Sequence, residues 1–395
     1  MIPNFNFASI PQILFGSGTI NQLFSIIPQY GRNLLYVIGK NSLRNSKKWN
    51  EVIDKSDVNS LNYSIISIRG EPSPNLIDSF IDQYRNQKID LVVGIGGGSV
   101  IDAGKAISAM LLKKDSVKDY LEGVGIKKHD GIKIPYIAVP TTSGTGSEAT
   151  KNAVLSEVGP EGFKKSLRHD NLIPNYAIID PELTISCPAS VTAACGLDAF
   201  TQLLEAYTSN KSNPMTDSLA YSGMIYMKDA IIPVCTTNPS DLNLRAIMAY
   251  GALMSGICLA NAGLGIVHGL ASSIGGFFRI PHGVVCGTLL AESTRMNIMN
   301  LKKLGSSGLE ALQKYATIGA LFDKKKIIEK TQIEYYCSLL ISNLEKWTID
   351  LGIEGLGKYG ISVNDIEKIV NSAGIKNNPV PLSEENIYKI MESRI

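Results

Sequence analysis

The first half of the chain alternates short runs of β-branched and aromatic residues with amphipathic stretches, and this alternation restricts the possible folds more than any other feature. It is typical of βαβ units arranged around a parallel sheet. The expected strands are Asn33–Ile38, Tyr63–Ile68, Asp90–Ile95, Tyr136–Pro140 and Tyr176–Asp180. From about Val191 onward, helical runs rich in Ala, Leu and Met follow one another. We therefore expect an α/β domain over residues 1–183 and an all-helical domain over residues 184–395.

Charge balance and cysteine spacing restrict the function and the compartment. The chain has 38 Lys and Arg against 36 Asp and Glu, so no broad basic field attracts nucleic acid or an anionic membrane. Small-molecule chemistry is expected instead. The six cysteines show no CxxC spacing, which argues against a zinc knuckle and a disulfide framework. Residues 1–16 lack the cationic region and apolar core of a secretory signal, so the sequence predicts a cytoplasmic protein.

One long uncharged segment raises the alternative of a membrane span. Residues 246–278 contain no Asp, Glu, Lys or Arg, and that length is enough to cross a bilayer. The segment is interrupted at Asn261–Gly265 and carries His268 and several glycines. Two buried helices that pack through small residues explain it better.

The stretch VVGIGGGSVIDAGKA, over residues 92–106, nearly spells two nucleotide-binding motifs. The third glycine of G-x-G-x-x-G and the first glycine of the phosphate loop both fall on Ser99. In addition, Lys105 is followed by Ala106, where the phosphate loop requires Ser or Thr. Neither motif is complete, so the ligand of this turn has to be inferred from its context.

That context is a strand followed by a helix. Gly96, Gly97 and Gly98 are expected to form the turn between them, with Ser99 as the N-cap of the helix. Free backbone N–H groups at a helix start, next to glycines that allow close approach, bind phosphate. A tight turn that needs only conformational freedom is the alternative.

A second polar loop follows the next expected strand. The sequence PTTSGTGSE places Thr141, Thr142, Ser143, Thr145 and Ser147 in one turn, where hydroxyls and amides bind a phosphate or a ribose. A plain Ser/Thr/Gly surface loop is the alternative. Because both loops follow carboxyl ends of parallel strands, they lie on the rim of the sheet where α/β folds bind ligands.

Six motifs, in their order along the chain, resemble those of the iron-containing (group III) alcohol dehydrogenase family. They are GIGGGSVIDAGKA, PTTSGTGSE, IIDPEL, GLDAFTQLLEAYTS, GLGIVHGLASSIGG and IPHGVVC, and the similarity covers almost the whole chain. The resemblance implies a dehydroquinate synthase-like architecture, in which the α/β domain binds NAD(P)(H) and the helical domain holds a divalent metal. It implies hydride transfer between the nicotinamide and a small alcohol or aldehyde, in a homodimer or higher homo-oligomer.

The resemblance also implies the cofactor residues. Gly97, Gly98 and Ser99 are expected to hold the pyrophosphate, with Thr141 and other threonines of the second loop beside the cofactor. The full expected set is Gly39, Asn41, Ser42, Gly96, Gly97, Gly98, Ser99, Asp102, Thr141, Thr142, Thr145, Asn152, Lys164 and Leu183.

The segment after the first expected strand favours NADP(H) over NAD(H). NAD-specific dinucleotide folds carry a carboxylate there to bind the ribose hydroxyls. Here the residues are Gly39, Lys40, Asn41 and Ser42, with Arg44 nearby, so no acid opposes a 2′-phosphate. A solvated basic surface loop is the alternative.

The metal ligands that the resemblance implies are Asp198, Gln202, His268 and His282, and the catalytic role falls to Asp198, His268 and His282. Gln202 occupies a position where the family carries His, so an amide oxygen replaces an imidazole nitrogen. The remaining histidines and carboxylate suit Fe(II) and also Zn(II). Ser272 similarly replaces a family histidine, which leaves proton transfer to a hydroxyl, water or the cofactor ribose. Without the resemblance, buried polar residues that only satisfy the core are the alternative.

The run FKKSLRHDNLIP bears on the substrate. Lys164 matches the lysine that the family places near the cofactor, and Lys165, Arg168 and His169 add charge. A cationic wall of this kind favours an acidic aldehyde or alcohol, such as a phosphonate or a carboxylate. The pairing of KSLRH in this run with DAFTQLLEAY is similar to the phosphonoacetaldehyde-reductase-like branch of the family. A salt-bridged surface segment is the alternative.

Two other functions stay open at this point. One is a lyase or polyol(-phosphate) dehydrogenase of the same superfold, against which PTTSGTGSE and IPHGVVC argue. The other is a nucleotide-binding sensor with a decayed site, suggested by Gln202 and Ser272. The retained Asp198, His268 and His282 argue against decay.

Overall fold

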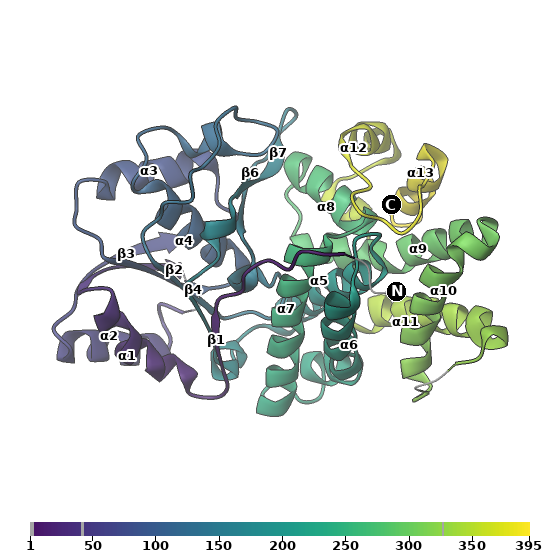
Figure 1. Cartoon of the computed structure of the whole chain (residues 1–395), viewed down its shortest axis with the longest axis horizontal. Helices are drawn as coiled ribbons and strands as arrows, with labels where there is room; N and C mark the ends of the chain where they lie inside the picture. Colours follow the sequence, from purple (N-terminus) through teal and green to yellow (C-terminus); the bar gives the residue numbers. More distant parts are fainter. Residues whose placement is uncertain (1–3, 41–42, 326–327) are drawn as a thin grey trace.

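The structure of the chain is a computed structural model that describes residues 4–40, 43–325 and 328–395. Figure 1 shows a sheet with flanking helices formed by the first half of the chain, and a group of helices formed by the second half. The expected α/β and all-helical classes are confirmed for the two halves.

Six parallel strands form the main sheet, in the order β1-β8-β5-β4-β2-β3. They are β1 (Gln12–Phe15), β2 (Asn33–Gly39), β3 (Asn62–Ile68), β4 (Leu91–Gly96), β5 (Tyr136–Pro140) and β8 (Tyr176–Ile179). All five expected strands are confirmed, with ends that differ by one residue at most. The edge strand β1 was not predicted, because its four residues are only partly buried and show no clear alternation.

Helices cover both faces of this sheet. Leu35 and Val37 of β2 belong to one apolar cluster, whereas Leu34, Tyr36 and Ile38 belong to another, as the alternation of side chains along a strand requires. The helices of this half are α1 (Leu23–Ile26), α2 (Lys47–Val58), α3 (Pro74–Tyr84) and α4 (Gly98–Met110). Because both faces are covered, β2 and β4 are almost continuously apolar.

The strand order creates a switch point between β2 and β4. From β2 the chain moves outward to β3, then returns to the other side of β2 to form β4 and continues through β5 to β8. Open α/β sheets bind ligands at the carboxyl ends of the strands that flank such a point. Here those ends are Gly39 and Gly96.

A short antiparallel hairpin stands apart from the main sheet. It consists of β6 (Asn152–Glu157) and β7 (Phe163–Arg168), and it was not predicted because its charged residues obscure the alternation. The hairpin packs against α4 on one side, and β7 packs against the helical half on the other (Figure 1). It therefore connects the two halves.

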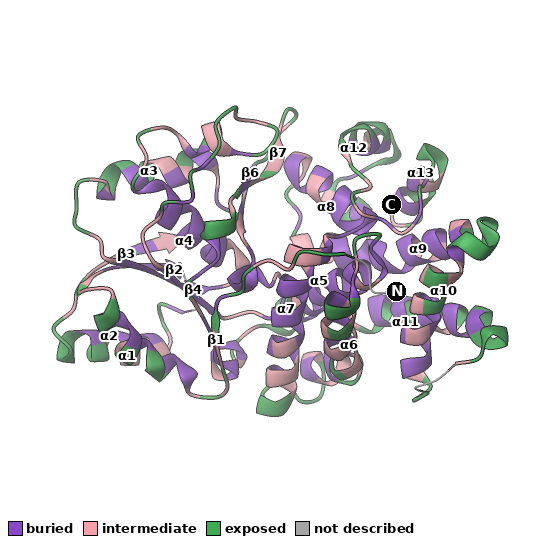
Figure 2. Ribbon diagram, viewed as in Figure 1, coloured by how far each residue is buried: buried purple, intermediate pink, exposed green. Residues whose placement is uncertain are grey.

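In the described residues after Ile179, every regular element is a helix. The helices are α5 (Ala189–Thr208), α6 (Pro214–Cys235), α7 (Leu242–Ala262), α8 (Ile266–Phe277), α9 (His282–Lys303), α10 (Leu309–Phe322), α11 (Ile333–Asp350), α12 (Ile366–Ser372) and α13 (Glu384–Glu392), with short 3₁₀ turns between some of them. Figure 2 shows that α5 is buried along most of its length. It packs against α6, α7 and α9, so it forms the centre of this half.

The uncharged segment forms two helices, α7 and α8, as expected. By length and composition α7 could cross a membrane, but most of its apolar window is buried against α5 and α6. The domain boundary expected between residues 183 and 184 falls in the connection from β8 to α5 and stays a prediction.

Candidate active site

The glycine turn joins β4 to α4 at the switch point. Gly96 ends the strand, Gly97 is the N-cap of α4, and Gly98 is its first residue. The expectation that Ser99 is the N-cap is therefore wrong, because the N-cap lies two residues earlier, at Gly97, and Ser99 lies in the first turn of the helix. No side chain caps this helix. Its first N–H groups have no acceptor within the helix, so they are available to an anion.

The second polar loop lies directly against this turn. A Cβ atom placed on Gly97 would lie 3.3 Å from Thr142 Oγ1, and one placed on Gly98 would lie 2.8 Å from Thr145 Oγ1. Thr141 joins the loop to the strand end, since its N–H donates to the carbonyl of Gly96 at 2.9 Å. The two loops thus form one polar surface.

Lys105 does not point toward this surface. Its side chain is fully buried, and its ammonium lies 2.8 Å from Ser147 O, 2.7 Å from Asn152 O and 3.0 Å from Thr150 Oγ1. The lysine that suggested a phosphate loop therefore ties the second loop to α4. The turn is therefore not a phosphate loop of the G-x-x-x-x-G-K-[ST] type, in which the lysine contacts the phosphates.

Several other expected cofactor residues have structural partners. Asp102 is buried on α4 and accepts a short hydrogen bond from Ser147. Leu183 is buried in the core beside the main sheet. Asn152 begins β6, and its amide lies 3.5 Å from Ser166 Oγ on β7.

At the end of β2, Gly39 lies close to α4. Among the described residues, a Cβ on Gly39 would contact only Val100, at 3.9 Å, which is an ordinary van der Waals distance. Asn41 and Ser42 lie outside the described residues. Contact between these positions and a cofactor stays a prediction.

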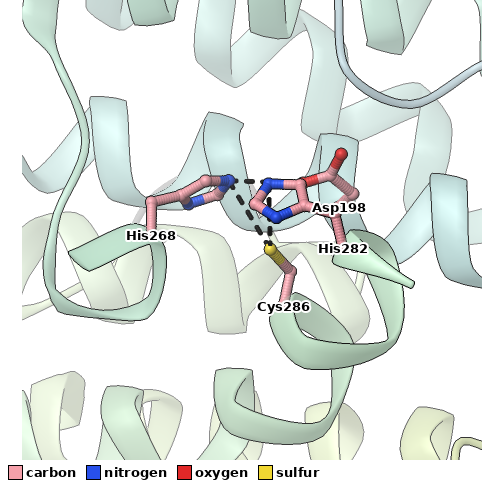
Figure 3. A group of neighbouring side chains, drawn as sticks. All are labelled: Asp198, His268, His282 and Cys286. Carbon is pink, nitrogen blue, oxygen red and sulfur yellow. Dashed lines mark hydrogen bonds and ion pairs between the residues drawn. The ribbon is translucent and has the colours of Figure 1, made fainter. Parts of the chain in front are cut away.

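In the helical half, four side chains converge (Figure 3). Asp198 comes from α5, His268 from α8, and His282 and Cys286 from α9, and one ligand atom of each lies within 4.8 Å of the others. Asp198 Oδ1 is 3.2 Å from His268 Nε2 and 3.7 Å from His282 Nε2. These four side chains are called the cluster below. Sequence reasoning missed Cys286, although its position four residues after His282 on one helix was a usable signal.

Glu205 orients one of the histidines. It lies on α5, where its carboxylate accepts a hydrogen bond from Val267 N at 2.7 Å and lies 2.7 Å from His268 Nδ1. This contact turns His268 Nε2 toward the cluster and fixes its tautomer, as a carboxylate does behind a metal-bound histidine. The role of Glu205 was not predicted from the sequence, although it lies seven residues, about two turns, after Asp198.

Burial and mutual charge interactions shift the pKa values of the side chains in the cluster. Burial raises the pKa of the Asp198 carboxyl, but His282 and His268 outweigh that effect and hold the pKa at about 2. Burial raises the pKa of the Cys286 thiol to about 12. Burial and the charge of Lys164 lower the pKa of His282 to about 3. Its Nδ1 is buried and has no hydrogen-bond partner among the described residues.

The two positions that depart from the family pattern lie beside the cluster. Gln202 Nε2 is 3.3 Å from Asp198 Oδ1, and Gln202 Oε1 is 2.9 Å from Ser255 Oγ. Ser272 Oγ donates to the carbonyl of His268 at 2.7 Å, and Lys376 Nζ donates to the same carbonyl at 2.9 Å. A role of Gln202 as a ligand stays a prediction.

The basic run on β7 is partly neutralised. Lys164 forms an ion pair with Glu71, and Arg168 Nε lies 3.1 Å from Glu122. The side chain of Lys164 also packs against α8, since a Cβ on Gly275 would be 2.9 Å from Lys164 Cδ. The run is therefore a salt-bridged segment that also faces the helical half.

The second polar loop connects the glycine turn to the cluster. Gly144 of this loop packs against α5, where a Cβ on Gly144 would lie 2.8 Å from Cys195 Cβ. Cys195 precedes Asp198 by about one turn of the same helix. A molecule that spans from the turn toward α5 would therefore run along this loop.

Known proteins with similar sequences and structures share this arrangement of two halves. The family model of the iron-containing alcohol dehydrogenases matches residues 11–181, and that of the C-terminal domain of the same family matches residues 192–395. A long-chain-alcohol dehydrogenase of Geobacillus thermodenitrificans is 32% identical over 98% of this chain and 97% of its own length. An NAD-dependent methanol dehydrogenase of Bacillus methanolicus is 26% identical over 99% and 100%. The crystal structure of a 1,3-propanediol oxidoreductase superposes with a TM-score of 0.88, at 26% identity and full coverage of both chains.

Proposed function

Because the chain belongs to the iron-containing alcohol dehydrogenase family and is an alcohol oxidoreductase, we propose that it transfers hydride between a nicotinamide cofactor and a small aldehyde or alcohol at the cluster. The observation that carries this proposal is the convergence of Asp198, His268 and His282 from three helices. The NAD-dependent relative and the free N–H groups at the start of α4 support the nicotinamide dinucleotide.

The donor set of the cluster fits a divalent metal. Two imidazole nitrogens and a carboxylate oxygen suit Fe(II) or Zn(II), and Glu205 supplies the support that such a histidine requires. When bound, the metal supplies a Lewis acid for the substrate oxygen, and the nicotinamide supplies or accepts the hydride. The proton of the alcohol would pass through a hydroxyl, water or the cofactor ribose, because Ser272 stands where many relatives carry a histidine.

The test of this function is metal analysis combined with NADPH and NADH oxidation over a panel of aldehydes. Bound iron or zinc together with metal-dependent oxidation is the expected result. Bound metal without hydride transfer to any aldehyde would favour a lyase. Nucleotide binding without metal or turnover would favour a sensor.

We further propose that the cofactor is NADP(H), and this leads to a first prediction. In Gly39→Asp, the added carboxylate repels the 2′-phosphate, so kcat/KM should fall about tenfold more with NADPH than with NADH, or about 1.4 kcal/mol. The neutral, equally large Gly39→Asn is the control, and a Cβ at this position meets no described atom closer than Val100 at 3.9 Å. Equal losses for both cofactors in Gly39→Asp would remove the argument for NADP(H).

An acidic aldehyde, such as a phosphonate or a carboxylate, is the substrate class that we propose. Its support is the charge near His268, where Lys376 lies 3.4 Å from Ser272 Oγ as well as bonding the His268 carbonyl. Desolvation lowers the pKa of Lys376. The charges of Glu205 and Cys286 oppose this lowering, whereas those of Arg168 and Lys165 add to it. Lys376 therefore lies at the His268 backbone, and the charges of Arg168 and Lys165 reach it.

The second prediction tests this substrate class. In Lys376→Met, kcat/KM for an acidic aldehyde should fall at least about tenfold relative to kcat/KM for a neutral aldehyde of the same length, because one cation is lost. Because general damage to the site lowers kcat/KM for both aldehydes, it cancels in the ratio of the two values. Lys376→Arg keeps the charge and should keep the preference. An unchanged ratio in Lys376→Met would contradict the proposed substrate class.

A further inference from the structure

Cys286 ends the IPHGVVC motif, and it is the one member of the cluster to which the family resemblance assigns no role. It lies one helical turn after His282 on α9, and its side chain is fully buried. Its Sγ is 3.6 Å from His268 Nε2 and 3.7 Å from His282 Nε2. A buried thiol that faces two imidazole nitrogens and a carboxylate has the surroundings of a metal-binding cysteine.

We infer that Cys286 is the fourth protein ligand of the metal, in place of the imidazole that Gln202 does not supply, and that it makes the site prefer Zn(II) over Fe(II). This inference rests on the proposed metal-dependent function. It concerns which donors hold the ion and which ion they select.

Four distances between ligand atoms of the cluster are close to those of a tetrahedral zinc site, and all the ligand atoms lie within 4.8 Å of one another. Zinc holds sulfur at about 2.3 Å and imidazole nitrogen at about 2.0–2.1 Å, so tetrahedral angles place these two ligand atoms about 3.6 Å apart. The observed separations from Cys286 Sγ are 3.6 Å and 3.7 Å. Nitrogen and oxygen ligands should lie about 3.4 Å apart by the same geometry, and the two Asp198 contacts are 3.2 Å and 3.7 Å.

Gln202 is held by other contacts. Its Nε2 donates toward Asp198, and its Oε1 faces the hydroxyl of Ser255. Turning the amide oxygen toward the cluster would exchange these two contacts and bring it against the Asp198 carboxylate. Gln202 therefore serves as a hydrogen-bond partner of the ligand Asp198, and the neutral amide adds no charge to balance a divalent ion.

The chemistry of the thiol gives the metal preference. Thiolate is a soft donor that selects zinc among the available divalent ions more strongly than an amide oxygen does. On binding, the Cys286 S–H proton leaves to solvent and a sulfur–metal bond forms, with no change in oxidation state. The thiolate and the Asp198 carboxylate together then balance the charge of the ion.

Cobalt substitution tests the inference without reference to turnover. Cobalt-loaded protein should show a thiolate-to-cobalt charge-transfer band in the near ultraviolet. The band should persist in Cys258→Ala, which removes another fully buried thiol of the helical half, and should vanish in Cys286→Ser. The ratio of zinc to iron affinity should also fall at least about tenfold in Cys286→Ser.

X-ray absorption on the zinc-loaded parent provides a measurement that needs no variant, and it should show one sulfur at about 2.3 Å. A parent that binds cobalt without the band, a band that survives in Cys286→Ser, or zinc without a sulfur neighbour would overturn the inference and leave the proposed function standing. A parent that binds neither cobalt nor zinc would overturn the metal site itself.

Discussion

Replacing His268 with Ala is expected to remove most of the bound metal and to lower kcat/KM by about a thousandfold or more, or about 4 kcal/mol. His268 contributes an imidazole nitrogen 3.2 Å from Asp198 Oδ1, and Glu205 holds the opposite ring nitrogen. The substitution removes a donor and leaves the buried Glu205 carboxylate with the Val267 N–H but without the His268 imidazole. Metal content and steady-state kinetics with a reactive aldehyde are the measurements.

Two further variants make the expected result specific. His169→Asn changes a histidine outside the cluster and keeps a side-chain acceptor for Asn171 N, so metal content and turnover should match the parent. Gln202→Ala should lose less metal than His268→Ala, because it removes a neutral amide that donates to Asp198. A folded His268→Ala protein with the metal and turnover of the parent would show that the cluster is not the active site.

Replacing Gly97 with Val is expected to weaken cofactor binding at least about tenfold, or about 1.4 kcal/mol, while the fold is retained. Gly97 has φ −73° and ψ 179°, which any residue adopts, so the backbone tolerates a side chain. A Cβ there already lies 3.3 Å from Thr142 Oγ1. The two additional methyl groups of Val enlarge the side chain at the N-cap of α4, where the pyrophosphate is expected to bind.

The Ala variant separates size from backbone effects. Gly97→Ala adds only the Cβ, so its loss of cofactor affinity should be clearly smaller than that of Gly97→Val. Fluorescence titration with NADPH and NADH measures the affinities, and thermal unfolding confirms that each variant is folded. An unchanged titration in folded Gly97→Val would disprove the role of the glycine turn in binding the cofactor.

Features that depend on residues close together in the chain could be predicted from the sequence. The five expected strands were found because each is a short apolar run with turn residues around it, and helices α7 and α8 because small residues interrupt the uncharged segment. The strand β1 and the β6–β7 hairpin were missed because β1 is only weakly apolar and the hairpin carries several charged residues. The N-cap was misplaced by two residues, because a serine is the better cap in isolation, whereas here the helix begins within the glycines.

Asp198, His268 and His282 could be selected from motifs, but the contacts that give them chemistry are tertiary. Asp198 and His268 are 70 positions apart in sequence, and Glu205 and His268 are 63 apart, so no local pattern shows that they touch. Cys286 joins the cluster only because α9 packs against both α5 and α8. Hydrophobic periodicity and turn formation depend on residues that are neighbours in the chain. The sequence alone therefore determined the α/β and helical classes of the two halves and the position of the glycine turn. The identity of the fourth donor, and the turning of Lys105 into the protein, depend on how those elements pack, and only the tertiary structure decided them.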